Sequence, residues 1–487
     1  MAFNGRVLVL GCGSVSQCTL PLLLGELKIP GKQITVLDMV DNRERIKNEL
    51  KKGVTYVVDH ITPESMDPVL SNYVGEGDIL IDLAWNIDCC EILDWCRSRG
   101  VRYLNTSVEL WDPYAGAENK HPLERTLYVR HMAMRRQIAR WGDNKGATAV
   151  VEHGANPGLV SHFTKWALCD ISDRLLADGK AKGKRRKAIE AARGAEDYPT
   201  LAQILGVKTI HISERDTQIT KVPKQVDEFV NTWSIEGFYE EGVAPAELGW
   251  GTHELRMPAG AYQHAGHGPG NQICLPQMGC KTWVRSWVPL GEITGMVIRH
   301  GEAFTISDHL TVWDDGQPVY RPTVHYAYCP ADVAIVSLHE LEMRQFELQE
   351  QQRILNDEIV SGADVLGVLL MGHDYKCWWT GSMLSIEETR ALVKSQNATT
   401  LQVAASVVGA IKWMMANPNE GVRVPDELPW REVLGVANKY LGTMHSGASD
   451  WDPVSTRRKL YAGYDGRDYN TDDVWQFTNF LVSENAR

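Results

Sequence analysis

Carboxylates and a tryptophan are concentrated in residues 213–254 of this chain. Glu214 lies near the start, Trp233 follows within the motif FVNTWSIEGF, and Glu241 comes eight positions later beside another acid. Carboxylates neutralise ammonium groups, and an indole face attracts a desolvated cation by about 1–2 kcal/mol. The segment is therefore typical of a site for an organic amine. A second interpretation stays open, in which the acids face solvent from a strand and Trp233 lies in the core.

A glycine motif near the start of the chain is the second candidate. Residues 11–16 read GCGSVS, which is G-x-G-x-x-G with Ser16 in the third position. Gly11 permits a tight turn, Gly13 lets the backbone approach a pyrophosphate, and the helix that begins at Ser14 and Val15 offers N–H groups. Asp38 follows Gly13 by 25 residues, where an acid accepts ribose hydroxyls and repels the extra phosphate of NADP. The pattern predicts an NAD site; the alternative is a turn capped by Ser14.

The first 150 residues alternate between β-branched runs and helical segments, which is what such a site requires. Nearly unbroken Val, Ile and Leu runs indicate strands buried on both faces, and hence a parallel sheet. The predicted strands are Arg6–Leu10, Gln33–Asp38, Thr55–Val58, Asp78–Leu83 and Arg102–Asn105. The predicted helices between them are Gln17–Leu27 and Arg43–Lys52. The fold class is therefore α/β, with a Rossmann-type doubly wound parallel sheet over residues 1–153.

The pattern changes after Gly154, where aromatic and polar residues interleave and glycines cluster over residues 260–270. Strands are predicted at Val207–Ile212, with a polar turn over Ser213–Asp216, and at Lys281–Val288 and Phe304–Val312, without regular helices between the later segments. Residues 154–390 are thus expected to form an α+β domain of mostly antiparallel strands that binds substrate and forms a dimer.

Two further helices are predicted outside these sheets. Residues 180–193 form a charged surface helix or an insertion, and residues 396–418 form a strongly apolar helix that ends at Asn-Pro. We expect the region from about 391 to 418, and the tail to residue 487, to pack back onto the first domain.

Composition excludes several classes of protein. The 487 residues carry 50 Lys+Arg against 62 Asp+Glu, a net charge of −12, which argues against a nucleic-acid partner. No apolar run reaches the roughly 18–20 residues of a membrane span. The ten cysteines are scattered without a C-x-x-C pair, which predicts reduced thiols and a cytoplasmic location. His264 and His267 form an H-x-x-H with no third ligand, so no metal site is predicted.

Many segments of the chain carry a family resemblance, from residue 7 to residue 477. They include VLVLGCGSVSQCTLPLL, GANPGLVSHF, HISERDTQ, FVNTWSIEGF, PAELGWGTHE, YRPTVHYAY and QNATTLQV. The chain closely resembles the bacterial homospermidine synthases, which are members of the saccharopine dehydrogenase-like group. In one departure, Asn86 is an amide where some relatives carry an aspartate.

The resemblance implies roles for particular residues. The catalytic residues it implies are Asn156, Glu214, Trp233, Glu241 and His300. The substrate-binding residues it implies are Asn86, Glu109 and Asp364. Beyond the glycine motif and Asp38, the cofactor-binding residues are Leu83, Ala84, Thr106, Asn156 and Pro157.

The reaction that the resemblance implies moves an aminobutyl group from putrescine, or from spermidine, to a second putrescine. A tightly held NAD takes a hydride from the carbon beside the amine and later returns it, so there is no net redox change. Because an ammonium has no free lone pair, a base must first deprotonate the amine. Glu214, Glu241 and His300 are the candidates for this base, and the sequence does not order them.

Two other functions remain open at this point. A net dehydrogenase of the saccharopine or carboxynorspermidine type would bind carboxylate substrates and need cations in its pocket, for which Arg215 and Lys221 are near. A nucleotide-sensing protein would keep the first domain but would not need the cluster of carboxylates and Trp233.

Overall fold

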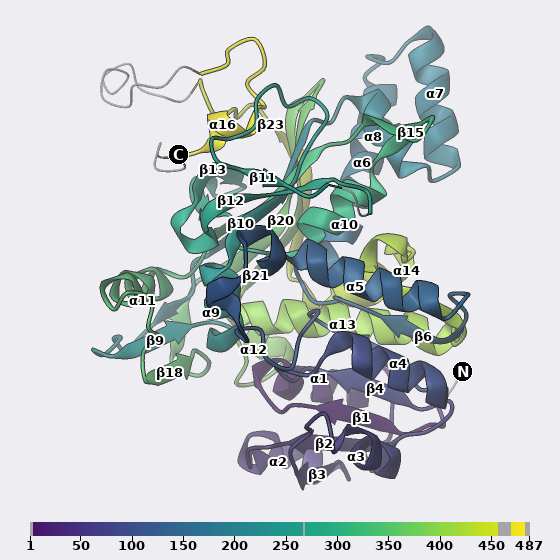
Figure 1. Ribbon diagram of the computed structural model, residues 1–487, viewed down its shortest axis with the longest axis vertical. Helices are drawn as coiled ribbons and strands as arrows, with labels where there is room; N and C mark the ends of the chain where they lie inside the picture. Colours follow the sequence, from purple (N-terminus) through teal and green to yellow (C-terminus); the bar gives the residue numbers. More distant parts are fainter. Residues whose placement is uncertain (1–2, 266–267, 456–468, 483–487) are drawn as a thin grey trace.

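The computed structural model describes residues 3–265, 268–455 and 469–482 (Figure 1). Two large sheets organise these residues, one of seven strands and one of ten. Within the described residues, no helix combines the length and apolar character needed to cross a membrane.

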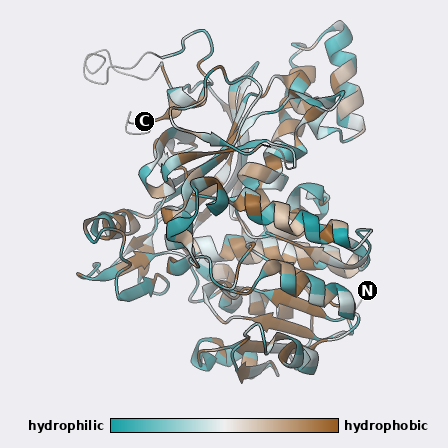
Figure 2. Ribbon diagram, viewed as in Figure 1, coloured by the Kyte–Doolittle hydropathy of each residue, from teal (hydrophilic) through white to brown (hydrophobic). Residues whose placement is uncertain are grey.

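The seven-stranded sheet is parallel throughout, in the order β22-β6-β5-β4-β1-β2-β3. Its strands are β1 (Val7–Leu10), β2 (Ile34–Asp38), β3 (Thr55–Val58), β4 (Ile79–Asp82), β5 (Arg102–Asn105), β6 (Gly146–Val150) and β22 (Glu420–Arg423). The central strands are strongly hydrophobic (Figure 2). Apart from the added β22, the order 3-2-1-4-5-6 is that of a dinucleotide-binding sheet. The predicted fold class is confirmed.

Helices cover both faces of this sheet. They include α1 (Ser14–Gly25), α3 (Met66–Tyr73), α4 (Cys89–Arg99), α5 (Leu127–Arg140) and α13 (Ala398–Ala416). The apolar helix α13 shares a buried cluster with α1 and β1, although nearly 400 residues separate the two helices. The side chain of Asn397 starts α13 by accepting a hydrogen bond from the Thr400 N–H at 2.8 Å. The chain thus returns to the first sheet after building the second.

The tail does not behave as predicted. Strand β23 (Thr443–Ser449) pairs with β21 (Lys376–Ser385) of the second sheet. Phe477 and Phe480 lie in a buried cluster of that same domain. The expectation that the tail packs on the first domain is therefore wrong for strand β23 and for the segment that carries Phe477 and Phe480. The physical reason is that these aromatic residues cover an apolar sheet face that would otherwise meet water.

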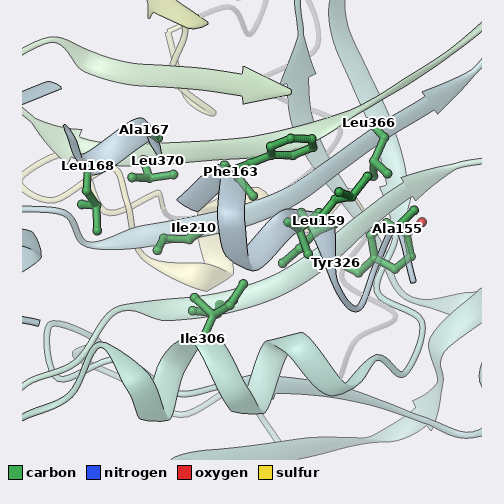
Figure 3. Close-up of a cluster of buried hydrophobic side chains, with 14 of the residues drawn as sticks. Ala155, Leu159, Phe163, Ala167, Leu168, Ile210, Ile306, Tyr326, Leu366 and Leu370 are labelled. Carbon is green, nitrogen blue, oxygen red and sulfur yellow. The ribbon is translucent and has the colours of Figure 1, made fainter. Parts of the chain in front are cut away.

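The second sheet runs β11-β12-β10-β17-β7-β20-β21-β23, and its pairs are antiparallel except β17–β7. The β13–β14 hairpin attaches to β17. The strands of this second sheet include β7 (Thr209–Asp216), β10 (Pro245–Gly249), β11 (Tyr262–Gln263), β12 (Gln272–Met278), β13 (Trp283–Val288), β14 (Gly291–Met296), β17 (Thr323–Cys329) and β20 (Ala363–His373). Helix α6 (Leu159–Ala177) packs on one face, and Figure 3 shows part of the resulting core, with Tyr326 near Ala155 and Leu366.

Two predictions for this domain are wrong. Residues 304–312 were expected to form a strand, but Gly301–His309 form helix α10. Because α10 is buried on several sides, its apolar residues do not follow a simple helical period. Ser213–Asp216 were expected to form a turn, but they continue strand β7 and are largely buried. Their polar side chains resemble a turn in sequence because they serve a polar site inside the domain.

Helix α7 (Gly183–Gly194) contains residues 183–193 of the charged segment 180–193, and Ile189 and Ala192 are its buried residues. Within the described residues, no cluster of three or more His, Cys, Asp or Glu side chains could hold a metal ion. His264 instead contacts Thr126 through Nε2 at 2.9 Å, and His267 lies outside the described residues.

Candidate active site

The glycine motif lies at the edge of the first sheet where its strands end. Gly11 follows β1 with φ of +81°, and a Cβ there would lie 2.8 Å from the Leu83 carbonyl oxygen. At Gly13 a Cβ would meet no atom within 4 Å, so the space above it is open. Gly13 is the N-cap of α1, and no side chain caps this helix. The alternative in which Ser14 caps the turn is therefore not observed, and the turn fits a pyrophosphate.

Asp38 ends β2 beside this turn. One carboxylate oxygen accepts a hydrogen bond from the Val40 N–H at 2.7 Å, and the other accepts one from the Cys12 N–H. Asp38 is thus held against the glycine motif, where a ribose would lie. The other predicted cofactor residues follow neighbouring strands: Leu83 and Ala84 come after β4, Thr106 after β5, and Asn156 and Pro157 after β6.

The loop between β6 and α6 connects the nucleotide edge to the second sheet. It is a tight turn, in which the Gly154 N–H donates to the Pro157 carbonyl at 2.7 Å. A Cβ on Gly158, whose φ is +133°, would lie 1.8 Å from the Gly154 oxygen, so only glycine fits. From this loop, the Asn156 side-chain amide donates to Glu214 Oε2 at 3.3 Å. Asn156 is therefore the direct link between the two sheets at the candidate site.

Three buried carboxylates share one face of the second sheet. Strand register pairs Asp364 with Asp216 and sets Tyr328 beside Glu214. Glu214 accepts a hydrogen bond from the Tyr326 hydroxyl, Asp364 Oδ2 accepts one from Thr399 Oγ1 at 2.6 Å, and Asp216 accepts one from Thr232. Asp364 Oδ1 is buried and accepts no hydrogen bond from a donor group of the described residues, while the Asp364 and Glu214 carboxyl groups are close enough to share a proton.

The electrostatics of this face favour a cationic ligand. Burial, reinforced by Asp216, raises the pKa of Glu214 to about 8. Burial, with Glu214 and Asp216 adding repulsion, raises the pKa of Asp364 well above its usual value. An ammonium placed between these groups would favour their charged forms and supply the missing hydrogen-bond donors.

Trp233 lies next to these acids through its contact with strand β17. Its indole N–H donates to the Tyr328 hydroxyl at 2.8 Å, and the Tyr328 ring stacks on Tyr326 at 5.2 Å. Helix α9 (Ile235–Val243) starts directly after it, with the Ser234 side chain accepting from the Gly237 N–H. Trp233 is only partly buried, and Glu214 is buried rather than facing solvent. The alternative with solvent-facing acids and Trp233 in the core is therefore not observed.

His300, the N-cap of α10, lies between two carboxylates. Its Nε2 is 2.8 Å from Glu241 Oε2, and its Nδ1 is 3.3 Å from Glu302 Oε1. Burial lowers the pKa of His300, but the two carboxylates outweigh it and raise the pKa well above its usual value. The His300 ring lies 4.4 Å from that of Tyr326, which joins this group to Glu214. An imidazolium held in this way orients Glu241 and is a poor base.

A second ionic group is built around Glu240, the residue before Glu241 in α9. The carboxylate of Glu240 accepts hydrogen bonds from Arg130 and Arg299, and all three side chains are buried. Burial raises the pKa of Glu240, but the two guanidinium groups outweigh it, so the net shift is downward. Glu109 lies in the same field, and burial followed by repulsion from Glu240 raises its pKa to about 7. Glu109 therefore lies beside the Glu240 group, with its Oε2 buried.

The structure brings together most, but not all, of the predicted residues. Asn86 lies in the loop after β4 with φ of +61°, and its buried Oδ1 has no hydrogen-bond partner. No described contact joins it to Glu214 or His300. Two acids of the segment 213–254 have structural roles. Glu247 accepts hydrogen bonds from the N–H groups of Leu127 and Tyr128. Glu254 accepts hydrogen bonds from the Thr323 hydroxyl and the Phe477 N–H.

Sequence reasoning missed several residues of this site. They are Asp216, Glu302, Tyr326, Tyr328, and the Glu240 group with Arg130 and Arg299. The alternation Tyr326-Ala327-Tyr328 within YRPTVHYAY was a usable signal, because residues two apart in a strand share a face. The arginine contacts had no signal, since they join residues 59 and 110 positions apart.

Comparisons with known proteins cover almost the whole chain. Residues 7–150 match the family model of the saccharopine dehydrogenase NADP binding domain, and residues 154–447 match that of the saccharopine dehydrogenase C-terminal domain. The chain is 39% identical to a homospermidine synthase of Blastochloris viridis, over 99% of this chain and 98% of the relative. It is 38% identical to one of Mesorhizobium japonicum, over 98% of this chain and 96% of the relative.

A solved structure agrees with these relatives. It is a homospermidine synthase from Legionella pneumophila in complex with NAD, with 36% identity and a TM-score of 0.87 over 99% of both chains.

Proposed function

Because this chain belongs to the homospermidine synthase family, within the saccharopine dehydrogenase-like group, we propose that it transfers an aminobutyl group from putrescine, or from spermidine, to a second putrescine. The product is homospermidine, and ammonia or 1,3-diaminopropane leaves. The observation that carries this proposal is the buried face of Glu214, Asp216 and Asp364, which joins the nucleotide edge through Asn156. An uncompensated set of buried carboxylates suits a chain with ammonium groups.

The enzyme uses NAD. When bound, this group would accept a hydride from the carbon beside the amine and supply it again to the imine. The open space above Gly13, the uncapped start of α1 and the position of Asp38 all fit this cofactor. Asp38 disfavours the extra phosphate of NADP because its carboxylate carries the same sign of charge. We further propose that the cofactor stays bound through the catalytic cycle.

Glu214 is the base that we propose for the reacting amine. Burial raises the pKa of its carboxyl group to about 8, so without a cationic ligand the group is protonated below that pH. An arriving ammonium favours the carboxylate, which can then accept the proton that the amine must lose. Tyr326 and Asn156 hold this carboxyl group by hydrogen bonds.

Asp364 and Trp233 have roles beside this base in the proposal. Asp364 Oδ1, buried and unpartnered, is suited to anchor the distal ammonium of the diamine. The indole of Trp233, fixed through Tyr328, is suited to stabilise the cationic imine by its ring face. Glu241 and Glu109, nearer the outside, are suited to receive the polyamine chain as it enters.

A net dehydrogenase for carboxylate substrates has less support. Arg215 donates to Asp332 and to the Pro330 carbonyl, and Lys221 is exposed. Arg130 and Arg299 are already paired with Glu240. None of these four cations is therefore available in the acidic face to bind a substrate carboxylate.

The deciding experiment supplies putrescine in large excess over NAD⁺. We expect homospermidine in many turnovers per NAD⁺, with no accumulation of NADH at 340 nm. One NADH per product would instead support the net dehydrogenase, and NAD binding without any product would support a sensing protein.

Two further expectations are part of the proposal. All ten cysteines are free, which supports a reducing compartment such as the cytoplasm. We also propose a homodimer formed through the second sheet. Light scattering of the purified protein measures this directly, and a monomer at micromolar concentration would contradict it.

A further inference from the structure

A groove of about 320 Å³ lies outside the candidate active site, between α5, α10, β22 and the turn Pro425–Glu427. Helices α5 and α10 lie side by side along it (Figure 1). Asp308 and His309, at the carboxyl end of α10, form part of its wall. His300 is at the other end of this helix, about 12 Å away at a rise of 1.5 Å per residue. The groove is at the lower end of the size range of small-ligand sites.

The charges of the groove are unbalanced. Asp308 Oδ2 contacts the guanidinium of Arg135, the cation of the lining, at 2.6 Å, and Glu427 Oε1 lies 3.7 Å from the guanidinium of Arg423 beside the groove. Among the described residues, Asp426 is the acid of the groove that has no ion pair. Behind the turn, Lys165 is not available to Asp426 Oδ2, because its ammonium donates to main-chain carbonyl oxygens of the turn. The carboxyl end of α10 adds the negative end of a helix dipole.

Two buried acceptors of the groove have no hydrogen-bond partner. Asp426 is 4% exposed, and its Oδ2 is unpaired. The Nε2 of His309 is also buried and unpaired. Burial lowers the pKa of His309, so the ring is neutral at pH 7 and Nε2 can accept a hydrogen bond. A buried carboxylate oxygen without a donor is costly, and a ligand with several N–H donors would satisfy it.

We propose that this groove binds a primary ammonium group of a diamine or polyamine, at a second site separate from the reacting one. An ammonium offers three donors and a positive charge, which match the unpaired oxygen of Asp426, the ring of His309 and the surrounding acids. A metal ion fits less well, since the described residues hold no cluster of three or more metal-ligating side chains. The inference concerns binding only and does not depend on the proposed reaction.

The test measures how many putrescine molecules bind per chain. The full-length Glu214→Gln protein loaded with NAD serves as the background, so that the diamine is not consumed. Isothermal titration calorimetry with putrescine at low ionic strength counts the sites per chain in this parent protein. Disrupting the groove should lower that count by one, and an unchanged count would overturn the proposal.

Two groove variants identify the second site. Asp426→Asn removes the charge, and we expect binding there to weaken by about tenfold or more. Val424→Phe keeps Asp426 but fills the groove from its partly exposed wall, and it should lose the same site. If Asp426→Asn does not fold, Val424→Phe decides the question alone.

The matched control is Glu432→Gln, which makes the same charge change at an exposed position of α14 (Trp430–Ala437) outside the groove. It should keep the same number of sites as the parent protein. The parent's number of sites in all three variants would overturn the proposal.

Discussion

Two groups of buried carboxylates lie close together in this protein and behave in opposite ways. Glu240 is held between Arg130 and Arg299, and the net effect on its pKa is downward. Glu214 and Asp364 have hydroxyl and amide partners, no cation of the described residues contacts them, and burial raises both pKa values. Both settings are buried, so burial alone does not decide the charge of an acid. The first group is neutralised within the protein, whereas we propose that a cationic ligand completes the second.

The largest effect that would test this comparison is the loss of turnover in Glu214→Gln. The amide keeps the size of the side chain but accepts no proton, so we expect activity to fall by roughly 10²–10⁴-fold. NAD content, measured by absorbance and mass spectrometry, should not change. Loss of the nucleotide would show that Glu214 belongs to the cofactor site instead. Glu432→Gln, exposed on α14, is the control and should keep full activity.

The ion-paired group of Glu240, Arg130 and Arg299 should contribute to the stability of the fold. Glu240→Gln leaves Arg130 and Arg299 buried without their carboxylate, and the free energy of unfolding should fall by about 3–5 kcal/mol. Denaturant unfolding measures this. Glu196→Gln, which breaks an exposed ion pair with Arg431, should cost less than about 1 kcal/mol. Equal effects of the two variants would contradict the structural role of the Glu240 group.

The cation–π contribution of Trp233 is a smaller effect. Trp233→Phe keeps an aromatic face but loses the N–H bond to Tyr328, so partial activity should remain. Trp233→Ala should lose most activity, since a desolvated cation–π contact contributes about 1–2 kcal/mol and packing is lost as well. Equal activity of the two variants, in kcat as well as kcat/KM, would remove this role.

The pH dependence of stability sharpens the comparison further. In the folded protein, burial raises the pKa of Glu214 to about 8 from its ordinary value of 4.5. The folded state therefore binds more protons between these values, and its stability falls as pH rises from about 4.5 to about 8. Glu214→Gln should flatten this slope by at most about 1.4 kcal/mol per pH unit. Thermal unfolding without substrate measures it, and an unchanged slope would argue against the raised pKa.

Much of the first sheet could be predicted because its physics is local. Strands such as β1 and β2 are continuous apolar runs, and the glycine turn between β1 and α1 has few alternatives. Predicted strand ends agree with the observed ends within one or two residues there. Helix α10 was misassigned because its environment, not its period, determines its structure.

Less of the site in the second sheet could be predicted. The importance of Glu214, Trp233 and His300 was inferred from residue types and from the family resemblance. Their arrangement depends on the register of β7, β17 and β20, which brings together residues more than 100 positions apart. Register depends on side-chain packing across strands, so a single segment carries no direct record of it.

The sequence by itself determined the nucleotide sheet, the position of the glycine turn and the presence of acids beside an indole, because each of these is written in neighbouring residues. Only the tertiary structure decided which acids are neutralised. Arg130 and Arg299 reach Glu240, and no guanidinium or ammonium group contacts Glu214 or Asp364 among the described residues. The physical reason is that a carboxylate takes its charge state from the groups packed around it, and long-range packing selects those groups.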